Sequence, residues 1–195
     1  MPRTESTMRD LGSLAPEFSL PDVSTGKTVN LGEAGDNPAF LAIFLSPHCP
    51  FVKHVQAEVA RLGEDYVGKG VRIVAISAND ATAYPDDGPE KLKEFAANLG
   101  LVFPLLYDEE QSTAKAYGAA CTPDFFLYDR DLKLAYRGQL DSSRPQSDIP
   151  VTGEDLRRAI EAVLAGTPVS TDQKPSIGCN IKWKAGNEPA YFSPT

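Results

Sequence analysis

The sequence lacks the features that would place the protein in a membrane or on a nucleic acid. Its longest apolar run, Ala39 to Leu45, is far shorter than the roughly 20 residues that a helix needs to cross a bilayer. Its first residues contain no apolar segment of the kind found in export signals. Positive charge is also scarce, because 19 Lys and Arg against 27 Asp and Glu give a net charge of -8, which leaves nothing to displace counterions from a phosphate backbone. We therefore expect a soluble cytoplasmic protein with no nucleic-acid partner and no membrane partner.

Cysteine and histidine are also rare. The three cysteines, Cys49, Cys121 and Cys179, cannot all pair within one chain. In a chain long enough to form its own core, free or redox-active thiols are expected rather than structural disulfides. His48 and His54 form no His-x-x-x-His pair, and the cysteines form no Cys-x-x-Cys pair, so the sequence favours no metal site. The glycines make no phosphate-binding loop, and we expect no cofactor.

Apolar segments along the chain alternate between strand and helix patterns, which predicts an α/β layer architecture. The run from Ala39 to Leu45 is typical of a central strand that is covered on both faces. A polar turn, Asp129 to Asp131, joins two late strands and indicates an antiparallel hairpin, so the sheet is expected to be mixed. The predicted strands are 39–45, 71–77, 101–107, 124–128 and 132–136, and the predicted helices are 50–62, 90–99, 111–117 and one that opens at Thr152.

The chain is expected to form one domain with an extension. Residues 1–165 carry the strand and helix patterns, whereas residues 166–195 have little periodicity. Ile177, Ile181 and Trp183 make this second segment too apolar for a solvated tail. We therefore expect the extension to pack back on the domain.

Cys49 is the strongest candidate for chemistry, because it lies between a buried strand and the helix that follows. Unpaired N–H groups at a helix start, together with the helix dipole, favour a thiolate over a thiol. Pro50 suits the first helical position, and His48, Lys53 and His54 could add positive potential. A lowered pKa is therefore expected for the Cys49 thiol. The alternative interpretation is a buried cysteine that packs as a small hydrophobe.

Several segments together resemble the redoxin branch of the thioredoxin superfamily, which is of the AhpC/TSA, peroxiredoxin-like type. The first three signals are an early apolar motif, the cysteine at the strand-to-helix junction, and a Thr-Pro pair before a late strand. Further segments are similar to an uncharacterised peroxiredoxin-like subfamily. The segments are Ala15 to Asp22, Phe44 to His54, Ala120 to Asp129, Tyr136 to Asp141, Ser143 to Pro145 and Lys174 to Lys184.

This resemblance implies a thioredoxin-like three-layer α/β/α sandwich with a mixed central sheet. Residues 90–107 would form the redoxin-type insertion. Pro123 would be a cis-proline that faces the active-site Cys49, with Thr122 beside it.

The sequence departs from the thioredoxin pattern at Ser46. Ser46 stands where thioredoxins carry the attacking cysteine of Cys-x-x-Cys, so exchange between two cysteines of that motif is excluded. The Ser-x-x-Cys arrangement instead resembles the peroxiredoxin motif, which implies that the hydroxyl of Ser46 stabilises the Cys49 thiolate. Two other features of that motif are missing, since Ala42 replaces its proline and Pro123 lies near the position of its activating arginine.

The resemblance implies a thiol-dependent oxidoreductase, a peroxiredoxin-like antioxidant in which Cys49 reduces a small peroxide or a disulfide. Cys121 is the leading candidate for the thiol that resolves oxidised Cys49, because it lies two residues before Pro123, and Cys179 is the alternative. An external thiol would regenerate the reduced protein. The second hypothesis is a non-catalytic redoxin-fold module that binds a partner or senses oxidation, having lost Cys-x-x-Cys exchange.

Overall fold

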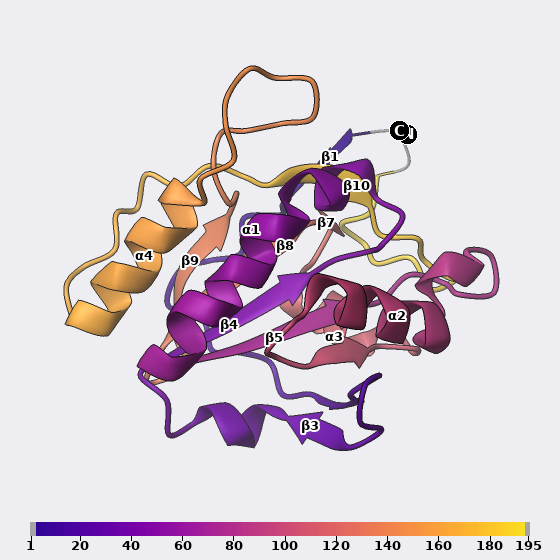
Figure 1. Cartoon of the computed structure of the whole chain (residues 1–195), viewed down its shortest axis with the longest axis horizontal. Helices are drawn as coiled ribbons and strands as arrows, with labels where there is room; N and C mark the ends of the chain where they lie inside the picture. Colours follow the sequence, from indigo (N-terminus) through magenta and orange to yellow (C-terminus); the bar gives the residue numbers. More distant parts are fainter. Residues whose placement is uncertain (1–2, 194–195) are drawn as a thin grey trace.

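The computed structural model describes residues 3–193 and contains a mixed sheet with helices on both faces (Figure 1). The strands are β1 Arg3–Glu5, β2 Ser19–Pro21, β3 Thr28–Asn30, β4 Ala39–Phe44, β5 Val71–Ser77, β6 Leu105–Tyr107, β7 Cys121–Thr122, β8 Asp124–Asp129, β9 Leu134–Gly138 and β10 Ile177–Asn180. The helices are α1 Pro50–Tyr66, α2 Pro89–Leu99, α3 Ser112–Tyr117 and α4 Glu154–Ala165. Short 3-10 helices, η1, η2 and η3, span Leu31–Ala34, Val67–Lys69 and Pro85–Asp87.

The central sheet has the strand order β6-β5-β4-β8-β9. Strands β4, β5 and β6 run parallel, whereas β8 is antiparallel to both β4 and β9. This arrangement confirms the expected α/β class and the mixed sheet.

Strand β4 shows how the layers form, because all six of its residues are buried. Side chains alternate between the faces of a strand, so Leu41 and Ile43 contribute to one core cluster and Phe40 and Phe44 to the other. Helices α1, α2 and α4 pack on the first cluster, and α3 with the segment that carries β2 and β3 covers the second. The continuous apolar run in the sequence reflects this burial on both faces.

Two element boundaries differ from the sequence prediction. Strand β6 begins at Leu105 rather than Leu101, since Pro104 has no N–H to donate to a strand pair. Helix α4 begins after Gly153 rather than at Thr152, because the N–H groups of both residues donate to the carboxylate of Asp141. Gly153 has a φ of 69°, which favours glycine.

The segment after α4 returns to the start of α1 (Figure 1). Its strand β10 pairs antiparallel with β1 on one side and with β7 on the other. At Gly178 a Cβ atom would lie 2.0 Å from the carbonyl oxygen of Thr122. Only glycine therefore permits β10 to approach β7 this closely, and this close pairing positions the cysteine that follows.

Candidate active site at the start of α1

Cys49 is the N-cap residue of α1, with extended backbone angles and Pro50 in the first turn. The preceding strand β4 is buried throughout and fixes where the helix starts. The Cys49 side chain is 0% exposed, and as a thiol it donates a hydrogen bond to the carbonyl oxygen of Thr122 at 3.1 Å. The cysteine thus has the helix-start position that the sequence predicts, but it lies beneath the protein surface.

Hydrogen-bond donors around the sulfur lower the pKa of Cys49 to about 5. The largest cause is the thiol of Cys179, which donates to the Cys49 sulfur, and burial opposes it. The side chain of Thr122 and the backbone N–H groups of Val52 and Cys179 act in the same direction as the thiol. Donors that favour the charged form can outweigh the cost of burial, so the surroundings of Cys49 favour its thiolate.

Cys179 reaches the site from β10, where it is the direct partner of Thr122 in β7. Its side chain is 2% exposed and belongs to the same core cluster as Cys49. The pKa of Cys179 is raised, first because its thiol donates to Cys49 and then because it is buried beside that charge. The interaction between the two groups thus lowers the pKa of Cys49 and raises that of Cys179.

Cys121 is oriented differently. Its thiol makes weak contacts with the carbonyl oxygens of Pro123 at 3.7 Å and Ser176 at 3.9 Å. Complete burial and the nearby Asp124 raise its pKa, with a smaller effect from the charge of Cys49. The structure thus places Cys179, rather than Cys121, in the same core cluster as Cys49, whereas the sequence favours Cys121.

Ser46 does not make the contact that the resemblance implies. Its hydroxyl lies 3.1 Å from Nδ1 of His48, and Thr122 supplies the hydroxyl that lowers the pKa of Cys49. Nδ1 of His48 also lies 2.6 Å from the buried carboxylate of Asp87, and the imidazole stacks on the ring of Tyr84. Ser46 therefore helps to hold His48, which lies next to the reactive cysteine in the chain.

The Thr122-Pro123 bond is cis, as the resemblance implies.

The basic side chains expected near Cys49 do not face its sulfur. Lys53 is exposed, and Nε2 of His54 lies 2.7 Å from the hydroxyl of Ser143. The cation that does interact with the pair is Lys182, which follows β10. Its pKa is lowered by burial, and negative charge on the cysteine pair opposes that shift.

Sequence reasoning missed three contributors, Lys182, Asp87 and Gly178. Only the motif Lys174 to Lys184 pointed to the segment that holds two of them. The third, Asp87, lies in the short 3-10 helix η3 and is 0% exposed, and nothing in the sequence singled it out.

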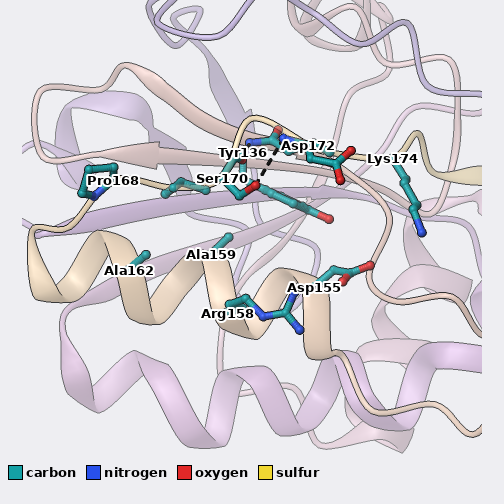
Figure 2. Close-up of a pocket in the computed structure, with 11 residues that line it drawn as sticks. Tyr136, Asp155, Arg158, Ala159, Ala162, Pro168, Ser170, Asp172 and Lys174 are labelled. Atoms are coloured by element: carbon teal, nitrogen blue, oxygen red, sulfur yellow. Dashed lines mark hydrogen bonds and ion pairs between the residues drawn. The ribbon is translucent and has the colours of Figure 1, made fainter.

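A separate groove of about 380 Å³ lies between α4 and the segment 168–174 (Figure 2). Figure 2 shows Arg158 and Asp155 from α4 on one side, with Tyr136 and Lys174 across from them. None of its lining residues belongs to the cysteine site. Within residues 3–193, no cluster of three or more potential metal ligands occurs, and no helix is long and apolar enough to span a membrane.

Comparison with known proteins identifies the family. A model of the AhpC/TSA family matches residues 11–137, which is more than half of the chain. The chain belongs to the AhpC/TSA family. This assignment confirms the resemblance seen in the sequence, and the matched region of the AhpC/TSA domain contains Cys49 and Cys121 but ends well before Cys179.

Three similar proteins add detail to the AhpC/TSA assignment. The crystal structure of an uncharacterised conserved protein from Geobacillus kaustophilus shares 57% identity, with a TM-score of 0.93 over 94% of this chain and 97% of that one. The thiol-disulfide oxidoreductase ResA of G. kaustophilus (strain HTA426) is 26% identical over 82% of each chain. The thioredoxin domain of a thiol-disulfide oxidoreductase from Bacteroides vulgatus has 18% identity and a TM-score of 0.61, over 80% of this chain and 98% of its own. The last match confirms the thioredoxin-like fold, and the family with its relatives supports thiol oxidoreductase chemistry in general.

Proposed function

We propose that this AhpC/TSA-family protein is a thiol-dependent oxidoreductase that reduces a small peroxide with Cys49. The observation that carries the proposal is the position of Cys49, which is the N-cap residue of α1 and lies 3.1 Å from the carbonyl oxygen of Thr122. Hydrogen-bond donors around the sulfur also lower the pKa of Cys49 to about 5. The thiolate is the nucleophilic form of cysteine, and the lowered pKa favours it.

The space around the site favours a small oxidant. Cys49 is 0% exposed, and β10, which carries Cys179, pairs with β7 next to it. A small peroxide needs a smaller opening of this buried site than a protein disulfide does.

The proposed reaction moves two electrons from sulfur to the peroxide. The Cys49 thiolate attacks one oxygen of ROOH, the O–O bond breaks, and RO⁻ leaves and takes a proton from water to become ROH. Cys49 is then a sulfenic acid. Condensation with a thiol gives a disulfide and water, and an external dithiol reductant, most simply a cytoplasmic one, restores the starting state.

One observation favours the alternative of a non-catalytic redox sensor, namely the complete burial of Cys49. A sensor would oxidise once and slowly, whereas an antioxidant enzyme must turn over. Turnover with an added dithiol therefore separates the two functions.

The test is peroxide consumption by the reduced protein with a dithiol as reductant. We expect consumption with many turnovers in the wild type and none in Cys49→Ser, with Cys121→Ser as the matched control for loss of a buried thiol. The single tryptophan, Trp183, lies shortly after β10 and provides a fluorescence signal for each oxidation. Oxidation of Cys49 without turnover would support the sensor, and an unmodified Cys49 would exclude both functions.

A further inference from the structure

We propose that Cys179 is the thiol that resolves Cys49, so that the redox pair joins the start of α1 to the terminal strand β10. This inference rests on the proposed function, because it names the second half of the same redox couple. It assigns the resolving step to a residue outside the region that the AhpC/TSA family model matches.

The first argument is strand register. Residues that are direct partners across an antiparallel pair place their side chains on the same face. Cys179 is the partner of Thr122, the Cys49 sulfur lies 3.1 Å from the carbonyl oxygen of Thr122, and Cys49 and Cys179 belong to the same core cluster. The register therefore orients the Cys179 thiol toward Cys49.

The same register disfavours Cys121. Successive residues of a strand point to opposite faces, so Cys121, the neighbour of Thr122, faces away from the side that carries Cys179. Its partner in β10 is Asn180, and its thiol contacts Ser176 and Pro123 instead. A disulfide between Cys49 and Cys121 would require β7 to rotate.

The second argument is the order in which the thiols become reactive. While Cys49 is a thiolate, the hydrogen bond to it, burial and its charge all raise the pKa of Cys179. A sulfenic acid at Cys49 carries no charge, so only burial still raises that pKa after Cys49 is oxidised. Oxidation of Cys49 therefore makes the Cys179 thiol easier to ionise.

Lys182 lies close enough to favour this second step. The charges of Cys179 and Cys49 both raise its pKa against the effect of burial, and its ammonium donates hydrogen bonds to the carbonyl oxygen and side chain of Asn180. A cation held in this position stabilises a Cys179 thiolate when it forms.

The resolving step balances as follows. The sulfur of Cys179 attacks the sulfur of the Cys49 sulfenic acid, the S–S bond forms and the S–O bond breaks. The proton of Cys179 and the departing hydroxide together make water. The external dithiol then reduces the Cys49–Cys179 disulfide by exchange. It becomes a disulfide itself and supplies the two electrons that restore both thiols.

Burial also favours an internal partner. Both residues are buried, at 0% and 2% exposure, and belong to the same core cluster. An external thiol could reach the Cys49 sulfenic acid only after β10 moved, so Cys179 is expected to react first.

The test is disulfide mapping in the full-length wild type, which needs no variant to fold. The reduced protein is oxidised separately with hydrogen peroxide and with oxidised glutathione, alkylated, digested without reductant and analysed by mass spectrometry. We expect a Cys49–Cys179 disulfide with either oxidant. Cys121→Ser should give the same product, whereas Cys179→Ser should accumulate sulfenic acid under peroxide, trapped with dimedone, and a glutathione adduct at Cys49 under oxidised glutathione.

Each other outcome has a defined meaning. A Cys49–Cys121 disulfide, or no intramolecular disulfide with either oxidant, overturns the inference. The disulfide with oxidised glutathione, together with an unmodified Cys49 under peroxide, supports the inference and rejects the proposed peroxide substrate. A stable sulfenic acid in the wild type under peroxide keeps the proposed nucleophile but rejects Cys179 as its resolving partner.

Discussion

Thr122 and Cys179 are direct partners across the β7 and β10 pair, and both lower the pKa of the buried sulfur of Cys49. The sulfur of Cys49 therefore lies where the start of α1, the strand β7 and the terminal strand β10 come together. The reactivity of that atom depends on how closely the two strands approach each other, and four predictions test this dependence.

The approach of β10 to β7 is tested by Gly178→Ala. The new Cβ would lie 2.0 Å from the carbonyl oxygen of Thr122, so the strands must separate, and overpacking of this kind costs about 1–3 kcal/mol or more. We expect a lower free energy of unfolding in urea and loss of the Cys49–Cys179 disulfide. The control is Gly68→Ala, because a Cβ added at Gly68 would have no other atom within 4 Å. This control should change the free energy of unfolding by no more than about 0.5 kcal/mol. Equal effects of the two variants would show that the close approach is unimportant.

The hydrogen bond from Cys179 to Cys49 predicts the pH dependence of alkylation. Because the pKa of Cys49 is lowered to about 5, the rate with iodoacetamide should be constant from pH 7 to 9 after correction for the reagent, and should fall as the pH drops through 5. Removing the donor in Cys179→Ala should raise the midpoint by about one to two pH units, since a hydrogen bond to a charged group contributes ~1.5–3 kcal/mol.

Cys179→Ser is the matched variant for that measurement. Its hydroxyl can still donate to the thiolate, so the midpoint should remain closer to that of the wild type. A midpoint near 9 in the wild type, the ordinary value for a thiol, would contradict the assignment of Cys49 as an ionised nucleophile.

The hydroxyl of Thr122 is tested by Thr122→Val, which keeps the shape of the side chain and removes its donor. We expect the pKa of Cys49 to rise, by less than in Cys179→Ala because the Thr122 side chain is the smaller of the two causes. Thr122→Ser should restore the low pKa. The absorbance of the thiolate near 240 nm, followed during a pH titration, reports the change without any substrate.

Ser46→Cys tests whether the site can be returned to a Cys-x-x-Cys motif. Ser46 is 0% exposed and three residues before Cys49, so the new thiol is expected to compete with Cys179 for the oxidised sulfur. We expect reduction of insulin by the variant, followed by turbidity with dithiothreitol as reductant, at a rate well above that of the wild type. Absence of any gain would mean that the start of α1 cannot present two sulfurs to one substrate.

The sequence alone predicted the reactive cysteine because the signal is local. A buried strand, a cysteine and Pro50 follow one another in the chain, and each determines the geometry of the next. The central strands were predicted for the same reason, since an apolar run such as β4 shows burial on both faces whatever its partners are.

The hydrogen-bond donors at the site could not be predicted, because they depend on pairing between distant segments. Cys179 faces Cys49 only through its register with Thr122, and no local pattern fixes that register. Cys121 was favoured as the resolving thiol because it is close to Pro123 in the chain. Side chains alternate along β7, however, so Cys121 points to the opposite face from Thr122. The resemblance to the peroxiredoxin motif implied that Ser46 contacts the sulfur, but Ser46 contacts His48, which the buried Asp87 holds in place.

The pairing of β10 with β1 has a consequence for the rate of the chemistry. Cys179 is also the partner of Arg3, so the first strand of the chain holds β10 over the buried thiolate. Regions of a protein open locally with their own free energies, which amide hydrogen exchange measures. If Cys49 reacts only when β10 detaches, its modification rate and the exchange of the β10 amides should change together. The N-terminal strand then acts as a kinetic gate for a sulfur far along the chain, and shortening that strand should accelerate modification of Cys49 without any change in the pKa of its thiol.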